Sequence, residues 1–106
     1  MAMLVCVRDE RCLTLNSAID TGDFLRTVDC SSMQLLRFID RYGNTTFNRL
    51  QIDEFLHEWN ELSRLARTPE EIKFVRDVVA LAQECKREPH LYLWFVGDSR
   101  PVASTA

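Results

Sequence analysis

The sequence is poor in glycine and in histidine, which limits the catalytic chemistry it can carry. Its 106 residues include three glycines, and its two histidines are His57 and His90. Three scattered glycines do not form the glycine-rich loop that binds phosphate groups, and no nucleophile stands beside either histidine. An enzyme or a small-ligand binder would therefore need a site assembled from distant residues. Such a site could include Cys30, Asp40, Tyr42 and His57.

Long apolar runs are also lacking. No stretch approaches the ~20 apolar residues that are needed to span a membrane, so we expect no membrane association. Residues 1–7 are apolar, but the charged residues 8–11 follow too early for the apolar region of a signal peptide. We therefore expect the protein in the cytoplasm.

The four cysteines have neither the density of a disulfide scaffold nor the spacing of a metal finger or a thioredoxin motif. We interpret them as reduced thiols. Cys6 and Cys85 fall within apolar patterns and are expected in the core. Cys30 stands beside two serines and is expected to be the most exposed of the four.

The charge balance gives no sign of a nucleic acid partner. The sequence has 16 acidic and 13 basic residues, and its net charge of −3 argues against a general affinity for phosphate backbones. Nearly all of the basic residues are arginines, but they are scattered along the chain and form no basic block.

Two segments have a spacing typical of metal sites. Residues 40–51 faintly resemble an EF-hand calcium loop, but Tyr42 stands where an oxygen ligand is needed and Gln51 replaces the final glutamate. Glu54 and His57 have the Glu-x-x-His spacing of di-iron proteins, which need a second such pair. Both residues lie opposite the apolar side of a predicted helix, and Glu58 and Glu61 are expected to share their solvated acidic face. We therefore expect no metal and no cofactor.

The most apolar stretch, residues 91–96, organises the predicted fold. It is short, it is rich in aromatic and β-branched residues, and it is bounded by Pro89 and Gly97. These features are typical of a strand that is covered on both faces. We expect Trp94 to lie in the hydrophobic core.

The N-terminal part of the chain predicts a hairpin and a loop. Residues 3–7 and 12–15 read as two strands joined by the charged residues 8–11, and the second, shorter strand suits a sheet edge. Residues 16–29 show no sustained period and predict a loop, with at most one helical turn at Phe24.

Residues 31–39 are ambiguous, because their apolar residues fit either a short helix after a serine cap or a strand. The turn-forming residues 40–44 and the β-favouring residues 45–47 follow. This succession favours a hairpin over residues 35–47.

Two helices are predicted from their start signals. Asn48 and Gln51 form a capping-box pattern before a helix that runs to about Ala66. Thr68 and Pro69 start a second helix, which ends before residue 89. The apolar faces are expected to consist of Ile52, Phe55, Leu56, Trp59, Leu62 and Ala66 in the first helix, and of Ile72, Val75, Val78, Val79, Ala82 and Cys85 in the second.

Together these elements predict an α+β fold. We expect an antiparallel sheet of about four to five strands, with an antiparallel helix pair packed on one face. Residues 1–98 are expected to form one domain, and residues 99–106 are expected to be a disordered C-terminal tail.

Because no catalytic motif is present, the leading hypothesis is a small interaction module, such as an inhibitor, an adaptor or an immunity-type partner of a larger protein. The alternatives are the enzyme or small-ligand binder named above and a structural subunit of a homo-oligomer, such as a homodimer. Apolar anchors ringed by charge are typical of protein interfaces. An alternative role for Phe24 is to fold back and close one end of the core. The residues predicted to bind a protein partner are Phe24, Leu25, Asp40, Arg41, Tyr42 and Asn44.

Overall fold

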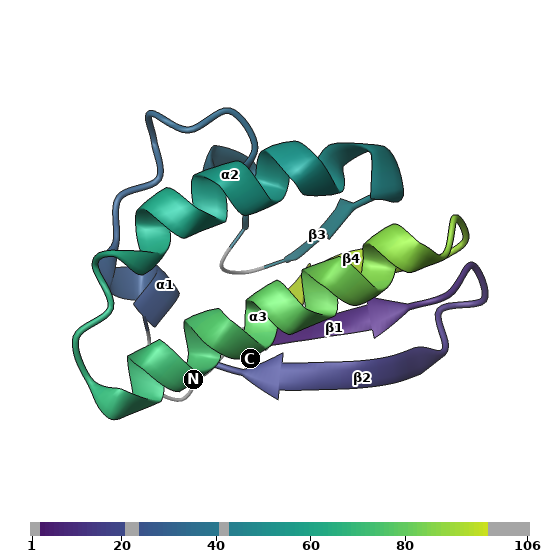
Figure 1. Cartoon of the computed structure of the whole chain (residues 1–106), viewed down its shortest axis with the longest axis horizontal. Coiled ribbons are helices and arrows are strands. Elements are labelled where there is room, and N and C mark those ends of the chain that lie inside the picture. Colours follow the sequence, from purple (N-terminus) through teal and green to yellow (C-terminus); the bar gives the residue numbers. More distant parts are fainter. Residues whose placement is uncertain (1–2, 21–23, 41–42, 98–106) are drawn as a thin grey trace, which may run out of the picture.

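The structure is a computed structural model, and it describes residues 3–20, 24–40 and 43–97. It contains a four-stranded antiparallel sheet with the strand order β2-β1-β4-β3, and Figure 1 shows α2 and α3 lying across one face of it. This arrangement confirms the predicted α+β fold. The elements are β1 (Leu4–Arg8), β2 (Thr14–Ile19), α1 (Phe24–Thr27), the 3-10 turn η1 (Leu36–Phe38), β3 (Asn44–Phe47), the 3-10 turn η2 (Arg49–Gln51), α2 (Ile52–Ser63), α3 (Pro69–Arg87) and β4 (Tyr92–Val96).

The predicted organising strand, β4, lies in the middle of the sheet between β1 and β3. Its side chains alternate, because successive residues of a strand point to opposite faces. Leu93 and Phe95 are fully buried, whereas Tyr92, Trp94 and Val96 are half-buried. The prediction of two covered faces was therefore wrong, since both long helices lie on the Leu93 side.

Trp94 consequently lies outside the hydrophobic core. It pairs with Cys6 of β1, and the guanidinium of Arg8 lies 4.9 Å from the centre of its indole ring. Its Nε1 is buried and has no hydrogen-bond partner among the described residues. Cys6 is fully buried as predicted, and this burial raises the pKa of its thiol. The apolar run could not reveal which of its two faces the helices would cover.

The predicted N-terminal hairpin is present, and it differs from the prediction in two respects. The turn between its strands is held by the Asp9 carboxylate, which accepts hydrogen bonds from the backbone N–H groups of Leu13 (3.0 Å) and Arg11 (2.9 Å). These bonds hold the pKa of Asp9 below its usual value. Cys12 lies in this turn with a φ of 64° instead of starting a strand. The second strand extends to Ile19, into the predicted loop, and it forms a sheet edge as expected.

Residues 31–39 contain turns and η1, so the predicted hairpin over residues 35–47 was wrong. The physical reason is a buried carboxylate from a distant part of the chain. Glu58 of α2 accepts hydrogen bonds from consecutive backbone N–H groups in this segment, which fold around it. β3 instead pairs with β4, with Phe47 opposite Leu93.

The start of α2 confirms the predicted cap. The Asn48 side chain accepts hydrogen bonds from the backbone N–H groups of Leu50 and Gln51, and the Gln51 side chain accepts one from the N–H of Asn48, so the capping box closes η2, which continues into α2. The helix ends at Ser63 and not at Ala66, and the following residues form turns. On its inner face Ile52, Phe55, Trp59 and Leu62 are buried as predicted, while Leu56 and Ala66 are partly buried.

The start of α3 also confirms its predicted cap, because the Thr68 hydroxyl accepts from the N–H of Glu71, whose carboxylate accepts from Thr68. Its buried face is turned slightly from the predicted one. Phe74 and Leu81 are buried, whereas Ile72 is exposed and Val79 is only partly buried. Val75, Val78, Ala82 and Cys85 are buried as expected.

The core is centred on Trp59 instead of Trp94. Its indole Nε1 donates a hydrogen bond to the carbonyl oxygen of Val75 at 3.1 Å, and its side chain is fully buried. The contact of Trp59 and Phe24 with Phe74 explains the rotated face of α3. The ring centres that surround Trp59 at 5.5–6.5 Å belong to Phe24, Phe55, Phe74 and Phe95.

Candidate functional site

The two segments with metal-like spacing do not form a metal site in the part of the chain that the structure describes. No three histidine, cysteine, aspartate or glutamate side chains gather there in an arrangement that could bind a metal ion. Glu54 and His57 are both exposed on α2. Over the same residues, no helix has the length and apolar character needed to cross a membrane.

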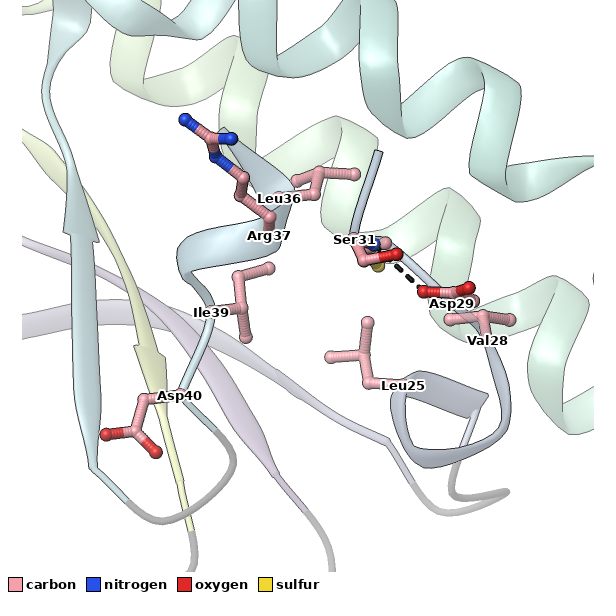
Figure 2. A pocket seen from close by; sticks show the side chains of 9 residues that line it. Leu25, Val28, Asp29, Ser31, Leu36, Arg37, Ile39 and Asp40 are labelled. Atoms are coloured by element: carbon pink, nitrogen blue, oxygen red, sulfur yellow. Dashed lines mark hydrogen bonds between the residues drawn. The ribbon is translucent and has the colours of Figure 1, made fainter. Parts of the chain in front are cut away.

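The candidate site is a hollow of about 370 Å³ between α1 and η1. In Figure 2 the side chains of Leu25 and Ile39 extend into the space between α1 and η1, whereas those of Arg37 and Asp40 point away from it. The hollow is therefore apolar inside and charged at its rim. Its lining consists of Leu25, Val28, Asp29, Cys30, Ser31, Leu36, Arg37, Ile39 and Asp40.

One wall of the hollow is positioned by Asp20, which is 1% exposed. Its two carboxylate oxygens accept hydrogen bonds from the backbone N–H groups of Phe24 (2.7 Å) and Leu25 (2.8 Å). The first N–H groups of a helix have no acceptor within the helix, and an aspartate side chain is among the preferred acceptors for them. Asp20 thereby fixes the short helix, in which Phe24 is buried in the core and Leu25 lines the hollow, and Val28, the residue after the helix, lines the hollow as well.

The opposite wall is positioned by Glu58, which is 6% exposed. Its Oε2 accepts from the N–H of Gln34 at 2.8 Å, and its Oε1 accepts from the N–H groups of Leu35 and Leu36 at 3.0 Å each. Three donors on one carboxylate are a strong, charge-assisted arrangement. Glu58 therefore ties η1 to α2. The prediction that Glu58 belongs to a solvated acidic face with Glu61 was wrong, although Glu61 is exposed.

The rim carries charged groups, and an exposed aromatic residue follows one of them in the sequence. Phe38 of η1 is 60% exposed, and the Arg37 guanidinium lies 4.8 Å from the centre of its ring. At the other side, Asp29 accepts a hydrogen bond from the N–H of Ser31 at 3.0 Å. The N–H of Asp40 donates to the Thr45 hydroxyl at 2.9 Å, which anchors the rim to β3.

The structure brings some of the predicted partner-binding residues together. Leu25 and Asp40 lie fifteen positions apart in the sequence and line the same hollow. Phe24 is 1% exposed and packs against Trp59 and Phe74, so its side chain belongs to the core. Asn44 is exposed at the start of β3. Arg41 and Tyr42 lie outside the described residues, so their predicted contacts stay predictions.

Three apolar residues of the hollow were not predicted as site residues, namely Val28, Leu36 and Ile39. Leu36 and Ile39 were placed in a hairpin strand. The signal that could have found them is the acid at position 58 on the inner side of α2, because a carboxylate there needs donors from another segment.

The predicted exposures of the cysteines are partly confirmed. Cys85 is buried like Cys6, and burial raises the pKa of its thiol to about 12. The exposed cysteine is Cys12 and not Cys30, which is half-buried at the hollow. Of the residues considered for a dispersed catalytic site, Cys30 and Asp40 line the hollow, whereas His57 is exposed on α2.

Models of known protein families give no match to the chain, and searches of curated proteins and of solved structures give none either. A function is therefore argued from the chemistry of the site, because a fold alone does not assign one.

Proposed function

We propose that the protein is a small protein-binding module, of the inhibitor, adaptor or immunity type, and that its hollow between α1 and η1 receives an apolar side chain of a larger partner protein. The observation that supports this proposal is the exposed ring of Phe38 on η1, the turn whose other two residues, Leu36 and Arg37, line an apolar hollow with a charged rim. Protein interfaces commonly have such a centre, with aromatic residues and arginine contributing most of the binding energy. Phe38 and Arg37 supply both types of residue on one turn.

The two buried acids support the same proposal. Asp20 and Glu58 hold the two walls of the hollow by hydrogen bonds to consecutive backbone N–H groups. A partner would then meet a preformed surface and would lose less binding free energy to the ordering of loops. Phe24 contributes indirectly, because its burial anchors α1 to Trp59 and Phe74.

A small-ligand binder is the second candidate, favoured by the size of the hollow. Its volume of about 370 Å³ falls within the range of ligand pockets, and its apolar interior is typical of them. No described residue that lines the hollow is a histidine. A ligand bound there would be held by Leu36 and Ile39 inside the hollow, with little dependence on Phe38, which is not among the residues that line it.

We further propose that the module works in the cytoplasm and does not bind nucleic acid. The four free cysteines support a reducing compartment. The net charge of −3 is the basis for excluding nucleic acid.

The test compares three forms of the protein as bait in extracts of the native host, with quantification of the bound proteins. The forms are the wild type, Phe38→Ala, and Leu50→Ala as the matched control, because Leu50 is an apolar residue that is 82% exposed on η2. A true partner should be lost with Phe38→Ala and kept with Leu50→Ala. Titration with the purified partner should then show a loss of at least about 2 kcal/mol, or roughly thirtyfold in Kd, for Phe38→Ala alone.

Two results would contradict the proposal. A partner that binds Phe38→Ala at full strength would place the interface elsewhere. A small molecule that co-purifies with both variants and is lost when Ile39 is replaced by aspartate would favour the small-ligand binder.

A further inference from the structure

The outer edge of the sheet at β2 is unusually open to pairing. Among the described residues, no strand pairs with β2 on the side opposite β1. None of its six residues is charged, and Leu15 and Ile19 are 51% and 54% exposed. Edge strands normally carry charges, proline or a cover that prevents pairing with another chain. The protection here is slight, because it consists of an irregularity in the pairing near Leu15 and a hydrogen bond from the Ser17 N–H to the Asn16 side chain.

The backbone groups at this edge define how a second strand would pair. The N–H of Asp20 donates to the carbonyl oxygen of Met3 at 2.9 Å, so the backbone of Asp20 faces β1. Because hydrogen-bonding direction alternates along an antiparallel strand, the backbone groups of Ser17 and Ile19 face the open edge. An identical antiparallel strand with Ser17 on the two-fold axis would place Leu15 opposite Ile19 of the second copy.

The neighbouring helix runs along the same edge. Ile19 shares a surface hollow with Glu70 and Lys73 near the start of α3, and Leu15 shares another with Glu84 and Arg87 near its end. α3 is therefore antiparallel to β2, as Figure 1 also shows. Two strands paired about a two-fold axis would bring two α3 helices side by side, also antiparallel.

The charges on this side of α3 are complementary under that rotation. Lys73 would lie at the level of Glu84 in the second copy, and Glu70 at the level of Arg87. The midpoint of each pair lies between residues 78 and 79, so the same two-fold axis relates both pairs. Residues 73 and 84 are about 16 Å apart along a helix, close to the roughly 17 Å length of β2. In one copy Lys73 pairs with Asp77 at 2.7 Å, but both side chains are exposed and such pairs contribute little.

From these observations we propose that the protein forms a two-fold symmetric dimer. In this dimer β2 pairs antiparallel with β2 of a second copy, and the two α3 helices form ion pairs with each other. Isologous pairing of this kind closes on itself and does not propagate into a fibre. None of the residues that line the hollow between α1 and η1 belongs to β2 or α3, so failure of the dimer and failure of partner binding are separate results.

The test is sedimentation equilibrium of the whole chain over a range of concentrations. The wild type should reach twice the chain mass of 12.4 kDa. Ser17→Lys should weaken dimerisation at least about tenfold, because it sets two like charges opposite each other across the axis. The control Leu50→Lys should have no effect, since Leu50 lies on η2, away from the proposed interface. Circular dichroism should show that both variants remain folded.

A charge exchange tests the register. Lys73→Glu and Glu84→Lys should each weaken the dimer, and the double variant should recover most of the loss, because the opposite charges then meet again. A wild type that stays monomeric at every concentration would overturn the proposal. A dimer that is unaffected by Ser17→Lys would exclude the β2 edge, and single charge changes without rescue in the double variant would exclude the proposed register.

Discussion

Replacement of Glu58 by alanine should destabilise the protein far more than any other acidic residue on α2. The change removes the acceptor for three backbone N–H groups, those of Gln34, Leu35 and Leu36. A buried donor left without a partner costs about 1–3 kcal/mol. The N–H of Leu36 is buried and should carry most of this cost, whereas the other two bonds are part-buried and water can replace them more easily. We therefore expect Glu58→Ala to lower the free energy of unfolding by about 3 kcal/mol.

Glu58→Gln should lose less, about 1–2 kcal/mol, because one oxygen remains to accept from Leu35 and Leu36 while the amide NH₂ faces the N–H of Gln34. Urea denaturation measures both losses. The control is Glu61→Ala, because Glu61 is exposed in a 3.8 Å ion pair with Arg64 and should change stability by less than about 0.5 kcal/mol.

Amide hydrogen exchange shows where the loss occurs. In Glu58→Ala the N–H groups of residues 34–36 should lose protection before the rest of the chain does, because η1 depends on this carboxylate. If Glu58→Ala cost no more than Glu61→Ala, or if protection at residues 34–36 were unchanged, the carboxylate would not fix this wall of the hollow.

Three further predictions concern other parts of the fold. Trp59→Ala should lower the free energy of unfolding in chemical denaturation by about 3–5 kcal/mol, and Trp94→Ala by only about 1–2 kcal/mol, because Trp94 is half-buried outside the core. Equal losses would contradict this assignment of the core. Cys12→Gly should raise the unfolding free energy by about 0.5 kcal/mol, because glycine adopts a φ of 64° without strain, and a loss would argue against this turn geometry. Iodoacetamide at pH 8 should modify the exposed Cys12 in the folded protein and spare Cys85, whose thiol has a pKa of about 12; mass spectrometry that finds Cys85 modified first would be inconsistent with its burial.

Both long helices could be predicted because their start signals are local. Asn48 with Gln51 caps the η2 turn that continues into α2, and Thr68 with Glu71 caps α3, in each case from within four residues. Such short-range hydrogen bonds depend little on the rest of the fold. The single helical turn at Phe24 was foreseen only as an option, since the Asp20 carboxylate accepts from N–H groups four and five positions ahead, farther than the usual capping spacing of two or three.

Two of the wrong predictions have long-range causes. The backbone of residues 34–36 binds Glu58, which is 22 to 24 positions away, and no local pattern contains that interaction. Trp94 was assigned to the core because a continuous apolar strand shows no difference between its two faces. Among the described residues predicted to bind a protein partner, Leu25 and Asp40 line the hollow. Leu36 was missed because its position depends on the Glu58 contact.

The central claim is that a partner protein contacts the hollow between α1 and η1, and site-specific photocrosslinking tests it most directly. A photoreactive phenylalanine analogue at position 38 in the native host should form a covalent link to one partner, and the same analogue at position 50 should not. The crosslinked partner residue should lie beside an apolar side chain that Leu25, Leu36 and Ile39 can enclose. Equal crosslinking from both positions, or none from position 38 while the partner still binds, would contradict the account.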